Sequence, residues 1–200
     1  MTKRVKTGKT GDNPVKRPVR RITHDPDPPH DPDPPMTLNP RPCASFEDGF
    51  AVAYEEELSG ETFFAALSEA EPDPRRAAIW AKFALIERRT HTVLRPMADA
   101  LGLAPADLGA VLQSGRDAAV SWAAMAWDDI MALMVRDYPA YVTEFHEVKA
   151  VAPPDMQTAM QLLIDHEVAF IDFARAELAA DPASATPLDA YLAHVAIWVP

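Results

Sequence analysis

Carboxylate side chains stand on otherwise apolar helical faces in this 200-residue chain. The clearest case is Glu167, which lies beside His166 in the segment 162–178. A helical repeat places Glu167 on one face with apolar residues three or four positions apart, namely Met160, Leu163, Phe170 and Ala174. A carboxylate on such a face must be protonated, paired or bound to a metal ion, because burial of a lone charge is very costly. Glu167 is therefore a candidate functional residue.

Two other segments repeat this arrangement. Glu87 falls on an apolar, aromatic stripe, and His91 follows it by four residues. Glu61 falls on another stripe, and Glu57 lies one turn before it. A fourth carboxylate is less clearly placed, and Glu144 is the candidate for it. Carboxylates from several helices, joined by imidazole nitrogens, bind metal ions in the cores of helical proteins.

Each of these carboxylates also has a simpler interpretation. A glutamate at the edge of an apolar stripe reaches solvent or pairs with an arginine. Arg88, Arg89 and Arg175 lie close enough in the sequence to serve as partners. Pairing of this kind would leave a helical domain without any bound ion.

The elements that must position these side chains are helices. From Ser45 onward Ala is abundant, Gly is scarce and no alternating β-branched run indicates a strand. We expect an all-α fold of four long helices with short additional helices. The predicted segments are 46–70, 74–101, a short helix over 105–115, 117–136 continued by 141–150, 153–178, and a short helix over 188–198.

The first 43 residues differ from the rest in composition. Residues 1–21 contain eight Lys or Arg side chains against one acid, Asp12, and the hexapeptide HDPDPP occurs twice in residues 24–35. Such a segment cannot bury a core, and its prolines favour extended conformers. We predict a disordered, basic and proline-rich tail over residues 1–43 and a helical domain over residues 44–200. The alternatives for the tail are a basic arm that docks onto an acidic or proline-recognising partner, and a weak metal chelator formed by its His and Asp side chains.

Three segments, YEEELSGETFFAAL, WAKFALIERRTHTVL and LLIDHEVAFIDFARAEL, resemble the ferritin-like superfamily, in particular its rubrerythrin and di-iron carboxylate group. The resemblance covers roughly residues 46–180 and implies a ferritin-like four-helix bundle. In that family, a Glu from the first helix and one from the third join a Glu-x-x-His from each of the other two. Glu61 (or Glu57) matches the first helix, Glu87 the second and Glu167 the fourth.

The chain departs from this pattern at the histidines, since Thr90 and Phe170 stand three residues after Glu87 and Glu167. The resemblance implies iron, in a dinuclear or mononuclear site, and chemistry linked to oxygen or peroxide. The expected metal ligands are Glu61, Glu87, His91, Glu144, His166 and Glu167. The alternative function is a metal-free helical bundle, without a cofactor, that acts as a binding or assembly module.

Composition excludes several other classes. The net charge of −11 argues against nucleic-acid binding by the folded domain, and the single cysteine, Cys43, excludes an intrachain disulfide framework. No apolar run of about 18 residues indicates a membrane span, and no secretory signal is recognisable. We expect a cytoplasmic protein that does not enter the membrane, with homo-oligomerisation left open.

Overall fold

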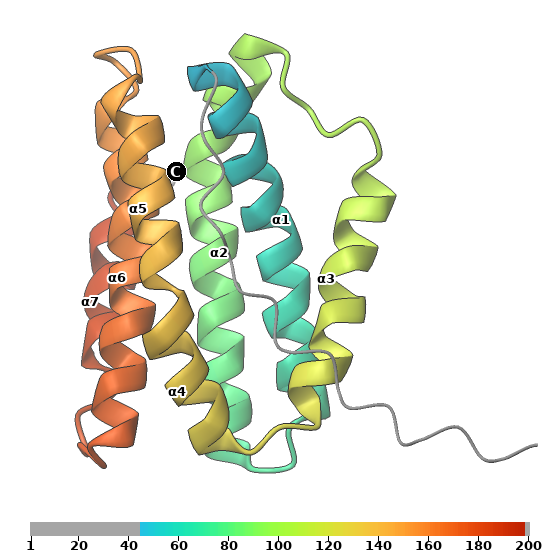
Figure 1. Ribbon diagram of the computed structural model, residues 1–200, viewed down its shortest axis with the longest axis vertical. Coiled ribbons are helices and arrows are strands. Elements are labelled where there is room, and N and C mark those ends of the chain that lie inside the picture. The colour runs from blue at the N-terminus through green and yellow to red at the C-terminus, as the bar shows by residue number, and fades with distance from the viewer. Residues whose placement is uncertain (1–44, 199–200) are drawn as a thin grey trace, which may run out of the picture. The chain divides into compact units, whose positions relative to one another are not determined.

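The computed structural model describes residues 45–198, and within this part of the chain every regular element is an α-helix. Figure 1 shows the helices in chain order. Their bounds are α1 (Phe46–Ala70), α2 (Pro74–Leu101), α3 (Leu108–Ala123), α4 (Trp127–Asp137), α5 (Pro139–Ala150), α6 (Gln157–Leu178) and α7 (Thr186–Val195). The all-α prediction is confirmed. The predicted tail over residues 1–43 lies outside the described residues.

The first two helices have the predicted bounds, because their caps are local. The Ser45 hydroxyl accepts a hydrogen bond from the Asp48 amide at 3.1 Å and begins α1. Asp73 caps α2 in the same way, followed by Pro74 at the first helical position. Gly102 ends α2 with a φ of 69°, a left-handed conformation that glycine adopts without strain.

The prediction for the third helix is wrong. A short helix over 105–115 and a long one over 117–136 were expected, whereas α3 runs without interruption through Gly115 and the chain breaks later, between α3 and α4. Gly115 is a point of close helix contact rather than a helix stop. A Cβ atom placed on it would lie 2.1 Å from the Ser59 carbonyl oxygen, and the Thr62 hydroxyl donates to the Leu112 carbonyl at 3.0 Å.

The later helices differ from the predicted segments only at their ends. Pro139 starts α5 immediately after Tyr138, as expected for a proline at the first helical position. Helix α6 begins at Gln157, four residues later than the predicted 153. The Gln157 side-chain amide donates to the carbonyls of Lys149 and Ala152, so it holds the preceding turn outside the helix. Helix α7 covers 186–195, against the predicted 188–198.

The helices pack in two groups that meet at α2. Helix α1 lies against α2 and α3, whereas α6 lies against α4, α5 and α7. Helix α2 contacts α6 and α7, and α1 contacts α5. In Figure 1, α4 and α5 follow one another along the same side, and α3 lies outside α1.

The core consists of two apolar clusters. One is rich in aromatic side chains and includes Phe64, Trp80, Phe83 and Phe170. The other includes Phe50, Tyr54, Leu94, Phe145 and Met160. On each of α1, α2 and α6, the residues of one cluster precede those of the other along the helix. The buried charged residues of these helices lie at the changeover.

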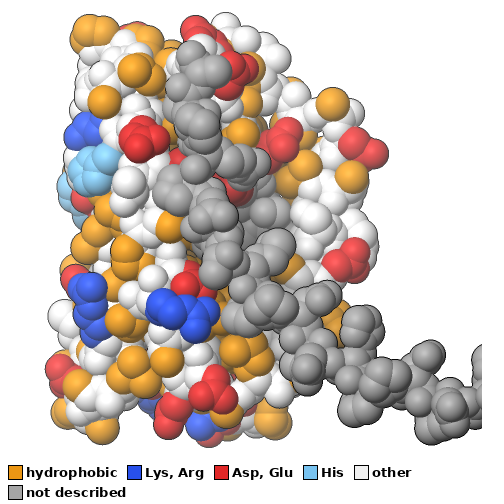
Figure 2. Space-filling view, viewed as in Figure 1, with side chains coloured by type: hydrophobic (Ala, Val, Ile, Leu, Met, Phe, Trp, Pro, Cys, Tyr) orange, Lys and Arg blue, Asp and Glu red, His pale blue; other side chains and the backbone are white. Residues whose placement is uncertain are grey.

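The surface carries most of the charge. Residues 45–198 contain 25 acidic and 10 basic side chains. On the face seen in Figure 2, the acidic side chains are spread over the molecule, while the Lys and Arg side chains gather in a few small groups. Among the described residues, no helix is both long and apolar enough to cross a membrane.

Candidate metal centre

Three helices bring buried polar side chains together at the junction of the two apolar clusters. Glu57 comes from α1, Glu87 from α2, and His166 from α6. Each is at least 95 % buried, and each presents one possible ligand atom within 4.8 Å of the other two. Glu167, also buried, adjoins His166 on α6. We call these four residues the carboxylate cluster.

The imidazole of His166 lies between two carboxylates. Its Nε2 atom is 3.5 Å from Oε1 of Glu57 and 3.4 Å from Oε1 of Glu167. Glu87 presents a carboxylate oxygen within 4.8 Å of the ligand atoms of Glu57 and His166. Two buried carboxylates this close repel each other, so protons or a cation must compensate their charge.

Burial and mutual repulsion control the protonation of the two glutamates. Burial, followed by the charge of Glu87 and the hydrogen bond to it, raises the pKa of Glu57 well above its ordinary value. Burial raises the pKa of Glu87 to about 8, against the opposing effect of the nearby His166. Without a cation, both groups consequently tend to hold protons near neutral pH.

The pKa of His166 moves in the direction that favours its cationic form. Burial alone would lower it, but the Glu167 carboxylate and its hydrogen bond, together with Glu87, outweigh burial and raise the pKa. The cluster thus holds acidic and basic groups whose protons are coupled.

Aromatic rings enclose the cluster. The ring of Phe170 meets the His166 ring edge-on at 5.2 Å between centroids, and the Phe145 and Tyr191 rings lie at 6.3 Å and 6.2 Å. The Tyr191 hydroxyl from α7 pairs with the Thr90 hydroxyl of α2 at 2.6 Å. These rings separate the cluster from water, which strengthens every charge interaction within it.

The donor set fits a metal ion on two observations. Glu57 and Glu167 each have one buried carboxylate oxygen, Oε2, without a hydrogen-bond partner, which is unusual for a buried acceptor. In addition, two ligands about 2.1 Å from one ion are separated by roughly 3.0–3.4 Å at right or tetrahedral angles. The Nε2–Oε1 separations of 3.4 and 3.5 Å are close to that range.

Three of the six expected ligands, Glu87, His166 and Glu167, lie in the cluster. Glu61 does not, because Glu57 lies on the buried stripe of α1, one turn earlier, and occupies the first-helix position. The Glu61 carboxylate instead accepts a hydrogen bond from Nε of Arg88 at 2.7 Å, at the edge of the α1–α2 contact. The simpler interpretation as an ion pair therefore applies to Glu61.

His91 and Glu144 also lie apart from the cluster. The His91 ring packs on Tyr54 at 5.3 Å, and burial lowers its pKa. Glu144 is partly exposed, since the residues that α5 buries are Phe145 and Val148. Among the described residues, the group that could hold a metal ion is the one formed by Glu57, Glu87 and His166.

Sequence reasoning did not identify the residues that surround the cluster. Thr90 and Tyr191 form their hydroxyl pair across 101 positions, a separation that no local pattern reveals. Tyr138 is also buried, and burial followed by the charge of Glu167 raises its pKa well above the ordinary value. The sequence contains a weak signal at Gly60. Glycine is unfavourable in the middle of a helix, so its presence there indicates a packing or functional role.

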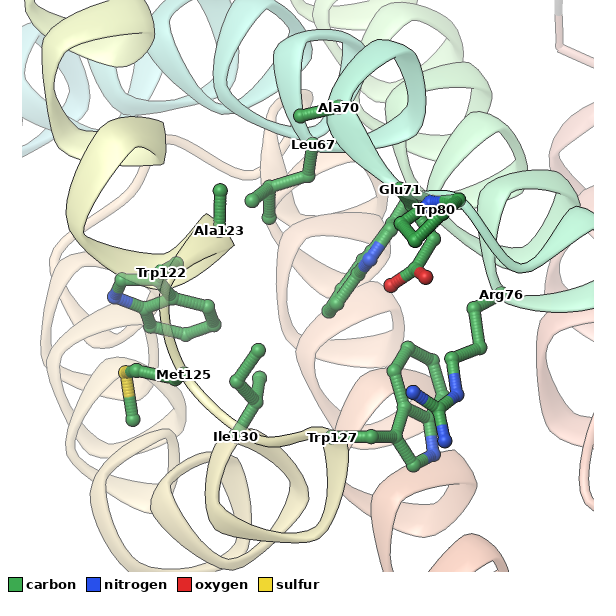
Figure 3. A pocket seen from close by; sticks show the side chains of 11 residues that line it. Leu67, Ala70, Glu71, Arg76, Trp80, Trp122, Ala123, Met125, Trp127 and Ile130 are labelled. Carbon is green, nitrogen blue, oxygen red and sulfur yellow. The ribbon is translucent and has the colours of Figure 1, made fainter.

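A separate aromatic pocket lies at the contact of α1, α2, α3 and α4 (Figure 3). Trp80, Trp122 and Trp127 line it, and the guanidinium of Arg76 lies 5.3 Å from the centre of the Trp127 ring. Its volume of about 40 Å³ has room for little more than water. No residue of the carboxylate cluster lines it, so we regard the carboxylate cluster as the candidate site.

We compared the chain with models of protein families, with curated proteins and with solved structures, and none of these comparisons finds a match.

Proposed function

We propose that this protein is a ferritin-like helical-bundle protein that binds a metal ion through Glu57, Glu87 and His166, with Glu167 as an adjacent carboxylate. The observation that carries the proposal is the convergence of these buried side chains from three helices, with ligand atoms within 4.8 Å of one another. Such a group costs stability unless protons or a cation compensate its charge.

In this proposal α1, α2, α6 and the successive helices α4 and α5 form the four members of the bundle, and α3 and α7 are additions. The contacts of α1 with α2, and of α6 with α4 and α5, support this assignment. The ligand pattern differs from that of the ferritin-like family. Thr90 stands three residues after Glu87 and pairs with Tyr191, and Leu163 stands three residues before His166. We therefore propose a single ion rather than two.

The chemistry of the donors narrows the choice of ion. Two carboxylates and one imidazole suit iron, manganese or zinc better than a soft ion such as copper(I). Iron is our proposal, and when bound it would supply one-electron redox chemistry linked to oxygen or peroxide. The chain's own contribution is to orient the ligands from three helices and to exclude water with Phe145, Phe170 and Tyr191.

Metal titration of the metal-free protein tests the proposal. We expect uptake of about one ferrous ion per chain by calorimetry and elemental analysis under anaerobic conditions. Manganese and zinc titrated in parallel identify the preferred ion. Glu57→Gln removes a ligand charge without changing the side-chain size, so the affinity should fall by more than about 100-fold. Glu61→Gln, one turn away, is the matched control. Uptake below about a tenth of an ion per chain would refute the proposal.

One observation favours a second function. His166 already lies between the carboxylates of Glu57 and Glu167, so the cluster forms a partly satisfied network without a cation. A metal-free helical bundle that acts as a binding or assembly module would retain this network. It predicts no ion uptake by the wild-type protein.

A further inference from the structure

Gly60 lies in the middle of α1, one helical turn after Glu57, and faces the side chain of Glu87 from α2. A Cβ atom placed on Gly60 would lie 2.8 Å from the carboxyl carbon of Glu87. It would lie 2.9 and 3.0 Å from the two carboxylate oxygens. The Glu87 carboxylate therefore occupies the space that any other residue at position 60 would fill with its own side chain.

Gly102, Gly109 and Gly115 do not face the carboxylate cluster. Gly102 adopts a left-handed conformation that ends α2, and Gly109 lies near the Asp107 cap of α3. Gly115 allows the backbones of α3 and α1 to approach, since its nearest neighbour is the Ser59 carbonyl. Among these four glycines, only Gly60 lies against a residue of the carboxylate cluster. Glycine is a poor residue for a helix interior, so this position is unfavourable for α1 by itself.

We infer that Gly60 is a positioning residue that holds the Glu87 carboxylate within reach of Glu57 and His166. Carbon atoms in contact are ordinarily about 3.5–4.0 Å apart, so a methyl group on residue 60 would displace the carboxylate by roughly 1 Å. Metal sites tolerate ligand displacements of only about 0.2 Å. Because Glu87 is 95 % buried, the displaced carboxylate cannot simply turn into solvent.

This inference rests on the proposed function for its effect on ion binding, but the contact itself is a property of the metal-free protein. Two measurements distinguish the effect on ion binding from the contact between Gly60 and Glu87. The first is the ion affinity of Gly60→Ala, which should be about 10–100-fold weaker than that of the wild type. Gly109→Ala, a glycine replacement in an exposed part of α3, should bind like the wild type.

The second measurement is a double-mutant cycle by urea denaturation of the metal-free protein, with Gly60→Ala and Glu87→Ala singly and combined. When Glu87 is absent, Gly60→Ala should show only the helix preference of alanine and raise the folding equilibrium constant by up to about fivefold. When Glu87 is present, the same change should leave the constant unchanged or lower it. The sign of the effect thus depends on the partner residue.

The outcomes are distinguishable. Equal effects of Gly60→Ala in the two backgrounds would overturn the contact inference, whatever the protein binds. Coupling in the cycle together with unchanged ion affinity would overturn the positioning role. Failure of the wild type to bind any ion, with coupling intact, would refute the proposed function and leave Gly60 as a residue that positions Glu87 in a metal-free network.

Discussion

The aromatic cluster and the carboxylate cluster are neighbours in the core, yet they are stabilised in different ways. Phe83 stacks on Phe170 at 4.0 Å between centroids and is completely buried, so packing alone satisfies it. One helical turn before Phe170 on α6, His166 and Glu167 face other ionisable groups. Two carboxylate oxygens in the cluster have no hydrogen-bond partner. Packing satisfies the aromatic cluster without any further group, whereas the carboxylate cluster needs protons or a cation to balance its charge.

The largest expected effect on stability comes from the loss of a ring in the aromatic cluster. Phe83→Ala removes a fully buried side chain that contacts Phe64, Trp80, Phe170 and Phe173. We expect a loss of about 3–5 kcal/mol in the free energy of unfolding, measured by urea denaturation. Leu85→Ala, which changes a partly exposed side chain on the same helix, is the control. A loss for Phe83→Ala no greater than that of the control would show that the aromatic cluster is poorly packed.

The second effect is a pH dependence of stability that arises from the carboxylate cluster. The pKa of Glu87 is raised to about 8, and that of Glu57 is also raised, so the folded metal-free protein binds protons more tightly than the unfolded chain. The contribution of these two protonated groups to the free energy of unfolding is fully present below the unfolded pKa of 4.5. It is lost as the pH rises from about 5 to 8. The raised pKa of His166 acts in the same direction between pH 6.5 and its folded value.

Urea denaturation at several pH values measures this dependence. The slope should reach about 1.4 kcal/mol per pH unit for each proton involved. Glu87→Gln keeps the shape of the side chain but cannot lose a proton, and it should flatten the curve. A stability that increases between pH 5 and 8 would contradict the raised pKa values of Glu57 and Glu87.

The smallest effect concerns the surface pair that lies one turn from the cluster. Glu61→Gln breaks the ion pair with Arg88, whose side chain is 60 % exposed, so the loss of stability should be below about 1 kcal/mol. The slope of stability with pH should not change. If Glu61→Gln instead flattened the pH curve as much as Glu87→Gln, Glu61 would have to be counted as a member of the carboxylate cluster.

The sequence allowed prediction wherever a structural signal is local. The caps at Ser45, Asp73 and Gly102 define α1 and α2, and the prediction of their bounds is confirmed. Gly115 was misread as a helix stop because the sequence does not show that α3 packs backbone to backbone against α1. A glycine at a helix contact and a glycine at a helix end look the same without the partner helix.

The candidate site could be predicted only in part for a similar reason. Periodicity placed Glu87 and Glu167 on inward faces, and both are buried, as is His166, the neighbour of Glu167. It favoured Glu61 over Glu57 on the first helix, whereas Glu57 is the buried residue, because residues four apart share a helical face. The depth of each depends on how α1 crosses α2, which is a tertiary property. The ring contacts and the Thr90–Tyr191 pair depend on α7, which is distant in sequence from α2.

The Thr90–Tyr191 pair has a consequence for shortened forms of the chain. Helix α7 supplies no residue of the carboxylate cluster, yet it places the Tyr191 ring beside His166 and the Tyr191 hydroxyl on Thr90. A chain without α7 would keep every proposed ligand but would lose one wall of the site, so that water could reach the buried carboxylates.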